Sequence, residues 1–382
     1  MKKLLLFIPV LLIACNSDDE ETPEPLKSDQ EIISEHLNIS LSNIPNYETV
    51  DYPIHYDPIT IDFNNIPDDN PITNKGAQLG RVLFYDVKLS MNNTISCASC
   101  HKQDVGFSDE AQFSTGFEGG LTGVHSMRLL NAQFFEPGQM FWDKRAATLE
   151  DQITGPIQDH IEMGFTEENG GLDALVEKLE TVPYYPVLFK EAYGDEAVTV
   201  ERLQKSVAQF VRSMVSIDSK FDEGFAQVYN PQQNGGGITN PFPNFSGAEN
   251  RGKILFMTRP FPNAPFCAGC HRPPTFALTS TALGNGLFEG QETVFKSPSL
   301  KSIALEQNFM HNGSFSTLEE VIDHYNSGVQ IGPATDQFLL DINGQPHQLG
   351  FSEQEKEDLV AFLETLTDNT IAEDPKFADP FK

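Results

Sequence analysis

The chain has 382 residues, with 25 Lys and Arg against 55 Asp and Glu, 39% hydrophobic residues and five cysteines. Its formal charge of −30 argues against a protein that binds the phosphate backbone of nucleic acid, because like charges repel each other. The hydrophobic content is enough to bury a core and argues against wholesale disorder. The length exceeds one typical domain and suggests two, and the odd number of cysteines requires an explanation.

Residues 1–15 (MKKLLLFIPVLLIAC) begin with two lysines and continue with a run of ten apolar residues. This run is too short to span a bilayer as a mature helix. Its end, LIAC, resembles a bacterial lipobox. The resemblance implies a signal peptide over residues 1–14, lipidation of the Cys15 thiol and a lipid anchor in the cell envelope, on the periplasmic face or the outer surface. The alternative is an ordinary signal peptide with a chance cysteine.

The segment after Cys15 is acidic, polar and rich in proline (NSDDEETPEP, residues 16–25). Such a composition cannot bury a core, so residues 15–60 are predicted to form a tether and an irregular N-terminal extension. Removal of the leader would leave 23 basic against 55 acidic residues and a charge of −32.

The rest of the chain contains a degenerate repeat. Residues 80–84 (GRVLF) precede CASCH at residues 97–101, and residues 252–256 (GKILF) precede CAGCH at residues 267–271. Each copy is therefore predicted to contain an amphipathic helix, a loop and a C-x-x-C-H motif.

A stretch rich in Gly, Pro and Asn, residues 232–247, separates the two copies and is typical of a linker or a long loop. We therefore predict one domain over residues 61–231 and a second over residues 248–372.

Most of the remaining sequence has the pattern of helices. Apolar residues recur with a spacing near 3.6 over residues 172–179, 200–215 and 317–325. The S-x-x-E patterns that begin at Ser246 and Ser352 are capping boxes, each predicting the start of a helix. Few stretches alternate apolar and polar residues, so little sheet is expected.

The C-x-x-C-H motif has a mechanical reason. Two thiols three positions apart can add to the two vinyl groups of one haem, and the histidine that follows then lies under the iron as a ligand. A zinc site would need four ligands, and no further cysteine is there to supply them. The motifs thus predict two covalently bound c-type haems, attached at Cys97 and Cys100 with His101 as a ligand, and at Cys267 and Cys270 with His271 as a ligand. Such a protein is either an electron carrier or an enzyme.

Further motifs carry a resemblance to a known family. They are GFSD at residues 106–109, FWDKRA at 141–146, LEDQ at 149–152, GPI at 155–157, IEMG at 161–164, SPSLK at 297–301, MHNG at 310–313 and TLEEV at 317–321. Together with the two C-x-x-C-H motifs, they make residues 70–370 similar to the bacterial di-haem cytochrome c peroxidase family, which includes MauG.

The resemblance implies a mainly α fold of two cytochrome c-like helical domains, each binding one c-type haem. The haem bound through His101 would be the peroxide site, and the haem bound through His271 would transfer electrons. Within the first domain, His125 stands where the family has an Asn that helps to hold calcium, so a calcium ion is a doubtful cofactor here.

Three residues are catalytic candidates by resemblance. Trp142 would lie between the haems, although a lone tryptophan is more often a packed core residue. Glu162 would shuttle a proton during peroxide cleavage, because a partly buried carboxyl can have a raised pKa. Gln152 would hold peroxide or its water by hydrogen bonds.

The expected sixth ligands depart from those of typical peroxidases. A distal histidine of the family would fall at residues 116–118, where none is present, so the first haem is expected to be five-coordinate or to hold only water. At the second haem Tyr325 stands where the peroxidases have Met and MauG-like proteins have Tyr. A phenolate stabilises oxidised iron, whereas a thioether raises the potential. Met310 is the alternative ligand.

The sequence therefore predicts an oxidoreductase that reduces hydrogen peroxide to water with electrons from a small c-type cytochrome or another donor. The acidic charge favours a donor with a basic docking face. The alternative is a MauG-like enzyme that oxidises protein side chains through a high-valent haem. A non-catalytic electron carrier is disfavoured, because a carrier needs no acid–base pair such as Gln152 and Glu162.

Overall fold

The computed structural model describes residues 27–135, 138–278 and 283–382. The predicted signal peptide and lipidated Cys15 lie outside the described residues. The described part is mainly helical, with one antiparallel pair of short strands, β1 (His271–Arg272) and β2 (Ala277–Leu278). The mainly α fold class is thus confirmed. Within these residues no helix is long and apolar enough to cross a bilayer.

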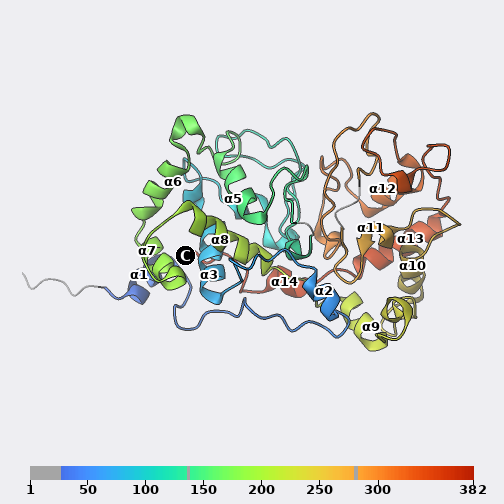
Figure 1. Ribbon diagram of the computed structural model, residues 1–382, viewed down its shortest axis with the longest axis horizontal. Helices are drawn as coiled ribbons and strands as arrows, with labels where there is room; N and C mark the ends of the chain where they lie inside the picture. Colours follow the sequence, from blue (N-terminus) through green and yellow to red (C-terminus); the bar gives the residue numbers. More distant parts are fainter. Residues whose placement is uncertain (1–26, 136–137, 279–282) are drawn as a thin grey trace, which may run out of the picture.

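Two lobes lie side by side in Figure 1. The first lobe contains α3 (Asn74–Tyr85), α4 (Cys97–Cys100), α5 (Leu149–Gln158), α6 (Gly171–Glu180), α7 (Tyr184–Tyr193) and α8 (Val200–Arg212). The second lobe contains α9 (Lys220–Val228), α10 (Gly247–Met257), α11 (Cys267–Cys270), α12 (Leu318–Asp323) and α13 (Glu353–Glu364). Each lobe encloses a core of its own.

Both lobes are built on one close crossing of two helices. In the first, α3 crosses α8 so tightly that a Cβ on Gly80 would overlap the carbonyl group of Ser206. In the second, α10 crosses α13, and a Cβ on Gly252 would overlap the carbonyl group of Asp358. These two glycines open the repeated segments GRVLF and GKILF, so the repeat in the sequence is a repeat in the structure.

The predicted helices are present, with changes at two ends. Both capping boxes are formed, at Ser246 before α10 and at Ser352 before α13. The periodic segment 200–215 becomes α8, which ends at Arg212, three residues early. The segment 317–325 becomes α12, which ends at Asp323 and continues as a π-helical turn, His324–Gly328.

The second core begins before the Gly- and Pro-rich stretch at residues 232–247. Phe221 and Phe225, one turn apart on α9, are buried in it, and Phe242 and Phe245 from that stretch join them. The stretch is therefore packed against the second lobe rather than extended between the lobes.

Both ends of the described chain tie the lobes together. The C-terminal segment leaves the second lobe through α14 (Asn369–Glu373) and returns to the first, where Arg81 donates to the carbonyl of Ala378 at 2.6 Å and Phe377 is buried. Near the N-terminus, α1 (Asp29–His36) packs on α7 and is followed by α2 (Pro58–Asp62). Just before α2, the Tyr56 hydroxyl reaches the second lobe at the carbonyl of Pro274.

A methyl group at the second crossing should loosen the lobe. Gly252→Ala places a Cβ against the backbone of α13, which side-chain rotation cannot relieve, and such overpacking costs about 1–3 kcal/mol or more. We expect the thermal midpoint to fall by about 2–10 °C. Gly123→Ala, where the added methyl meets open space, is the control and should leave the midpoint unchanged. Equal midpoints for the two variants would contradict the close crossing.

Candidate functional site

The first C-x-x-C-H motif lies in the wall of a cavity of about 160 Å³ in the first lobe. Cys97 and Cys100 are three positions apart on the single turn α4, so both thiols lie on one face. His101 ends the turn, and its Nδ1 lies 3.0 Å from the carbonyl oxygen of Phe107. Because a carbonyl only accepts, Nδ1 carries the proton and Nε2 keeps a lone pair for a metal. Burial lowers the pKa of His101 and keeps the ring neutral.

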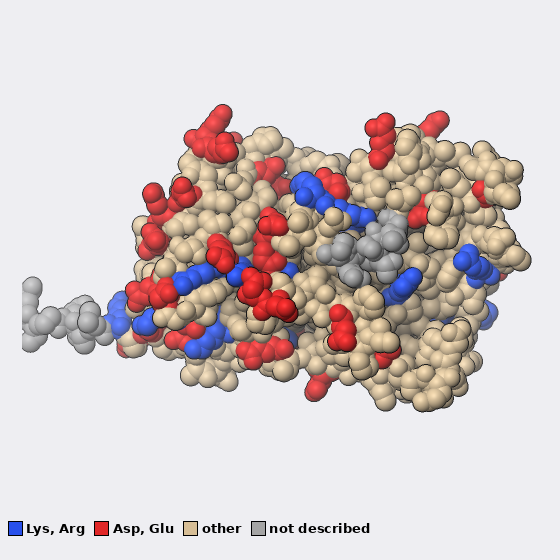
Figure 2. All heavy atoms as spheres, in the orientation of Figure 1, with Lys and Arg blue, Asp and Glu red and all other residues tan. Residues whose placement is uncertain are grey.

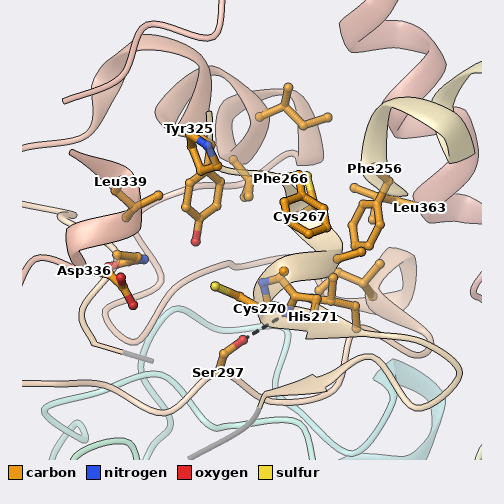
Figure 3. Close-up of a pocket in the computed structure, with 18 of the residues that line it drawn as sticks. Phe256, Phe266, Cys267, Cys270, His271, Ser297, Tyr325, Asp336, Leu339 and Leu363 are labelled. Carbon is orange, nitrogen blue, oxygen red and sulfur yellow. Dashed lines mark hydrogen bonds between the residues drawn. The ribbon is translucent and has the colours of Figure 1, made fainter. Parts of the chain in front are cut away.

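The second motif lies in the wall of a larger cavity, of about 510 Å³, in the second lobe (Figure 3). Cys267 and Cys270 again share a single turn, α11, and His271 follows as the first residue of β1. The Ser297 hydroxyl lies 3.3 Å from His271 Nδ1, and burial lowers the pKa of this histidine to about 4. β1 and β2 thus hold the His271 ring next to α11, the turn that carries the thiols of Cys267 and Cys270.

The residues around these cavities fit c-type haems. Each cavity offers two thiols, a neutral imidazole and mainly apolar walls, and the larger has the size of a typical ligand pocket. Two buried cations, Arg128 and Lys296, line both cavities. Burial lowers the pKa of Lys296 to about 7, and no carboxylate of the described residues pairs with it. Arg128 is already paired with Glu306 at 2.6 Å, so a carboxylate of a haem is the partner that Lys296 lacks.

Trp142 lines both cavities and so belongs to the wall between them. Its indole Nε1 donates to the carbonyl of His125 at 2.7 Å, and its own carbonyl accepts from the backbone N–H of Lys296 at 2.6 Å. The first contact holds the indole ring within the first lobe. The second joins the backbone of Trp142 to the second lobe. The backbone N–H of His125 also donates to the carbonyl of His311, at 2.9 Å, across the same boundary.

Gln152 and Glu162 both line the first cavity. Gln152 lies on α5, and Glu162 lies in the turn that follows, where its backbone N–H donates to the Asp159 carboxylate at 3.0 Å. Burial, reinforced by the charge of Asp159, raises the pKa of Glu162 to about 7, although Arg145 opposes the shift. This carboxyl therefore gains and loses a proton near neutral pH.

Two histidines line the first cavity among the described residues, His101 and His125. The ring of His125 is already engaged, because its Nδ1 lies 3.2 and 3.1 Å from the carbonyl oxygens of Ala111 and Gln112 and its Nε2 lies 3.2 Å from the Ser108 hydroxyl. Nor do the described residues contain a cluster of three or more His, Cys, Asp or Glu able to hold a metal ion.

Tyr325 and Met310, the two candidate ligands of the second haem, line the same cavity. Tyr325 stands on the π-helical turn, and its phenol points into the cavity between Cys270 and Leu339 (Figure 3). Met310 has a backbone φ of 71°, an unusual value for a side-chain-bearing residue. The structure brings both side chains to one place without choosing between them.

Sequence reasoning missed three polar residues of these cavities, Arg128, Lys296 and Asn285. The two cations carry no motif of their own, and an Asn between two glycines is typical of a turn. Arg128 and Lys296 depend on partners more than a hundred residues away, and Asn285 on partners 25 and 39 residues away, none of which a local pattern records.

Comparison with known proteins agrees with this geometry. A family model described as di-haem cytochrome c peroxidase matches residues 74–229. Methylamine utilization protein MauG of Methylorubrum extorquens is 32% identical over 315 residues, which is 78% of this chain and 80% of that protein. Cytochrome c551 peroxidase of Nitrosomonas europaea is 29% identical over 313 residues, 76% of this chain and 79% of that protein.

A solved structure is also similar. The crystal structure of a MauG-like protein associated with microbial copper homeostasis has a TM-score of 0.70 and 28% identity, and the match covers 87% of this chain and 99% of that one. The chain therefore belongs to the di-haem cytochrome c peroxidase and MauG family. It is an oxidoreductase of that family, as the motifs predicted.

The raised pKa of Glu162 should be visible in stability. The folded protein holds this proton more tightly than the unfolded chain, whose Glu pKa is near 4.5, so stability is lost as the pH rises from about 4.5 to about 7. Glu162→Gln removes that loss. We expect its thermal midpoint to exceed that of the wild type at pH 8 and to equal it at pH 4.

The matched control is Glu177→Gln, which changes an exposed glutamate on α6. Its midpoint should follow that of the wild type at both pH values. An effect of Glu162→Gln that is equal at pH 4 and pH 8 would show that the carboxyl is not held protonated by burial.

Proposed function

We propose that the protein is a di-haem c-type peroxidase that reduces hydrogen peroxide to water with electrons from a small redox donor such as a c-type cytochrome. The observation that carries the proposal is Glu162, a carboxyl with a pKa of about 7 in the wall of the first cavity, beside Gln152. An electron carrier has no use for a group that titrates at that place.

Haems attached at the two cysteine pairs, with His101 and His271 as ligands, would supply redox-active iron. The reaction consumes one peroxide, two electrons and two protons and yields two waters. In its ionised form Glu162 takes the proton from the inner peroxide oxygen and returns it to the leaving oxygen. Gln152 orients the peroxide by hydrogen bonds and brings no competing charge.

An open coordination position in the first cavity is supported by the state of its histidines. The His101 ring serves as the proximal ligand, and the His125 ring is engaged with Ser108 and two carbonyls. We therefore propose that peroxide meets a five-coordinate or water-bound iron. Because His125 stands where the family has an Asn that helps to hold calcium, and its ring is already engaged, calcium is no part of the proposal.

Trp142 is proposed to pass electrons between the two cavities, since it lines both and is hydrogen-bonded to each lobe. In the second cavity we propose Tyr325 as the sixth ligand, with Met310 as the alternative.

A second candidate is a MauG-like enzyme that oxidises side chains of a protein substrate. Two observations favour it, the Tyr325 phenol in the second cavity and the 32% identity to methylamine utilization protein MauG. A phenolate ligand would stabilise oxidised iron at the second haem and help to store oxidising equivalents there.

The donor and the place of action follow from charge and from the leader. Acidic side chains gather over the first lobe, around α6 and α7, on the face shown in Figure 2, whereas the second lobe shows few charges there. We propose a donor with a basic docking face, which the charge of −30 would steer toward the protein. We further propose a lipid anchor at Cys15 in the cell envelope.

Peroxide turnover tests the proposal. With ferrocytochrome c as donor, Glu162→Gln should lower kcat/KM for peroxide on the order of 100-fold or more, because the proton carrier is lost. In the wild type kcat/KM should rise with pH through an apparent pKa of about 7, as the carboxyl ionises.

Asp159→Asn is the matched control. It keeps an oxygen for the N–H of Glu162 but removes the charge that raises its pKa, so the acidic limb should move to lower pH while turnover persists. Equal rates for Glu162→Gln and the wild type would exclude the proposed acid–base role.

The two enzymatic candidates separate by their products. The peroxidase consumes donor and peroxide in a 2:1 ratio and leaves proteins unchanged. The MauG-like enzyme oxidises tyrosine or tryptophan of a protein with peroxide alone, which mass spectrometry detects. An absence of both reactions in the di-haem protein would support the electron carrier.

A further inference from the structure

Asn285 lines the second cavity between the two candidate ligands. Its side-chain Nδ2 donates to the Met310 sulfur at 3.1 Å. Its backbone carbonyl lies 3.0 Å from Nε2 of His324, the first residue of the π-helical turn that carries Tyr325. One residue thus contacts the loop of one candidate ligand and the turn of the other.

The amide presents its donor end to the cavity. A primary amide has two N–H donors and one acceptor oxygen. The Asn285 oxygen Oδ1 is buried without a hydrogen-bond partner among the described residues. The same side chain is also hydrogen-bonded to the Tyr325 phenol. Both candidate ligands therefore contact the same amide.

The two contacts have opposite consequences for a metal. A hydrogen bond to the thioether occupies a lone pair of the Met310 sulfur and holds the sulfur to Asn285. A hydrogen bond to the phenol oxygen orients the Tyr325 side chain within the cavity. The positive φ of Met310 adds a backbone strain that persists only where contacts hold the residue in place.

We infer that Asn285 is a positioning residue that selects Tyr325 over Met310 as the ligand of the second haem iron, an inference that rests on the proposed Tyr325 ligation. One N–H of the amide orients the phenol, and the other holds the Met310 sulfur to Asn285. The π-helical turn directs the phenol into the cavity, and the contact from His324 fixes Asn285 relative to that turn.

Spectra of the oxidised di-haem protein provide the first test. In the wild type, Tyr325→Phe should abolish the tyrosinate features of the low-spin haem. Asn285→Leu removes both donors at similar volume, so a thioether-to-iron charge-transfer band in the near infrared should replace those features. The double change Asn285→Leu with Met310→Leu should bring the tyrosinate features back, because no sulfur remains to compete.

The reduction potential of the second haem gives an independent readout with opposite signs. Asn285→Leu should raise it, because a thioether favours reduced iron. The double variant should lower it below that of the wild type, because a phenolate without a hydrogen bond donates more charge. Met310→Leu alone should leave spectrum and potential unchanged. Asn285→Asp, which keeps the shape of Asn but lacks the N–H donors when ionised, should give the spectral change of Asn285→Leu and serves if that variant does not fold; its added charge excludes it from the comparison of potentials.

Different results would contradict the ligation by Tyr325 and the role of Asn285. Tyrosinate features that survive Tyr325→Phe would overturn the proposed ligand, and with it the role of Asn285. Features that vanish in Tyr325→Phe but persist unchanged in Asn285→Leu would overturn the role of Asn285 alone.

Discussion

The rest of the structure depends on two helix crossings at which the backbones of the paired helices are in direct contact, without side chains between them. Gly80 and Gly252 let α3 meet α8 and α10 meet α13 at a separation that no side chain would permit. In each lobe the chain leaves the crossed helix and reaches its C-x-x-C-H turn within about a dozen residues, so the crossing fixes where the thiols lie. A wider crossing would displace the turn from its core and open the cavity to water, and a haem bound there would lose the dry surroundings that set its potential.

The second requirement is that the two cavities share a wall, and a few contacts between the lobes provide it. Trp142 and His125 from the first lobe meet Lys296 and His311 from the second through two hydrogen bonds between backbone groups. Such contacts survive side-chain rearrangement, because the backbone groups have no freedom to turn away. The crossing segments at both ends of the chain, near Tyr56 and in α14, further limit relative motion of the lobes. The proposed passage of electrons between the two sites would need a fixed distance, and these contacts would help to keep it.

Many of the helices and both haem-attachment motifs were predictable from local sequence. The capping boxes at Ser246 and Ser352 formed because their hydrogen bonds join residues three apart. The end of α12 was not predictable, because the apolar spacing near 3.6 runs on to Tyr325 and nothing in it marks the change to a π-helical turn at residues 324–328. The cations Arg128 and Lys296 escaped notice for a different reason. A buried charge looks like a surface charge in a sequence, and only the fold shows that both of these line two cavities. Asn285 likewise reads as part of a turn until its partners, Met310 and His324, are seen.

Burial of an ionisable side chain has different consequences in the two cavities, for Glu162 in the first and for Tyr325 in the second. In the first cavity burial brings the Glu162 carboxyl to a pKa of about 7, which suits a group that must both take and return a proton near neutral pH. In the second, burial pushes the Tyr325 phenol away from ionisation, so a phenolate there requires a compensating charge. Ferric iron would supply most of that compensation, and the Asn285 amide contributes a directed hydrogen bond. The same low-polarity surroundings would thus favour a mobile proton at Glu162 and, with the proposed ligation, an anion held by the metal at Tyr325. The difference lies in whether a metal bond is available to hold the charge.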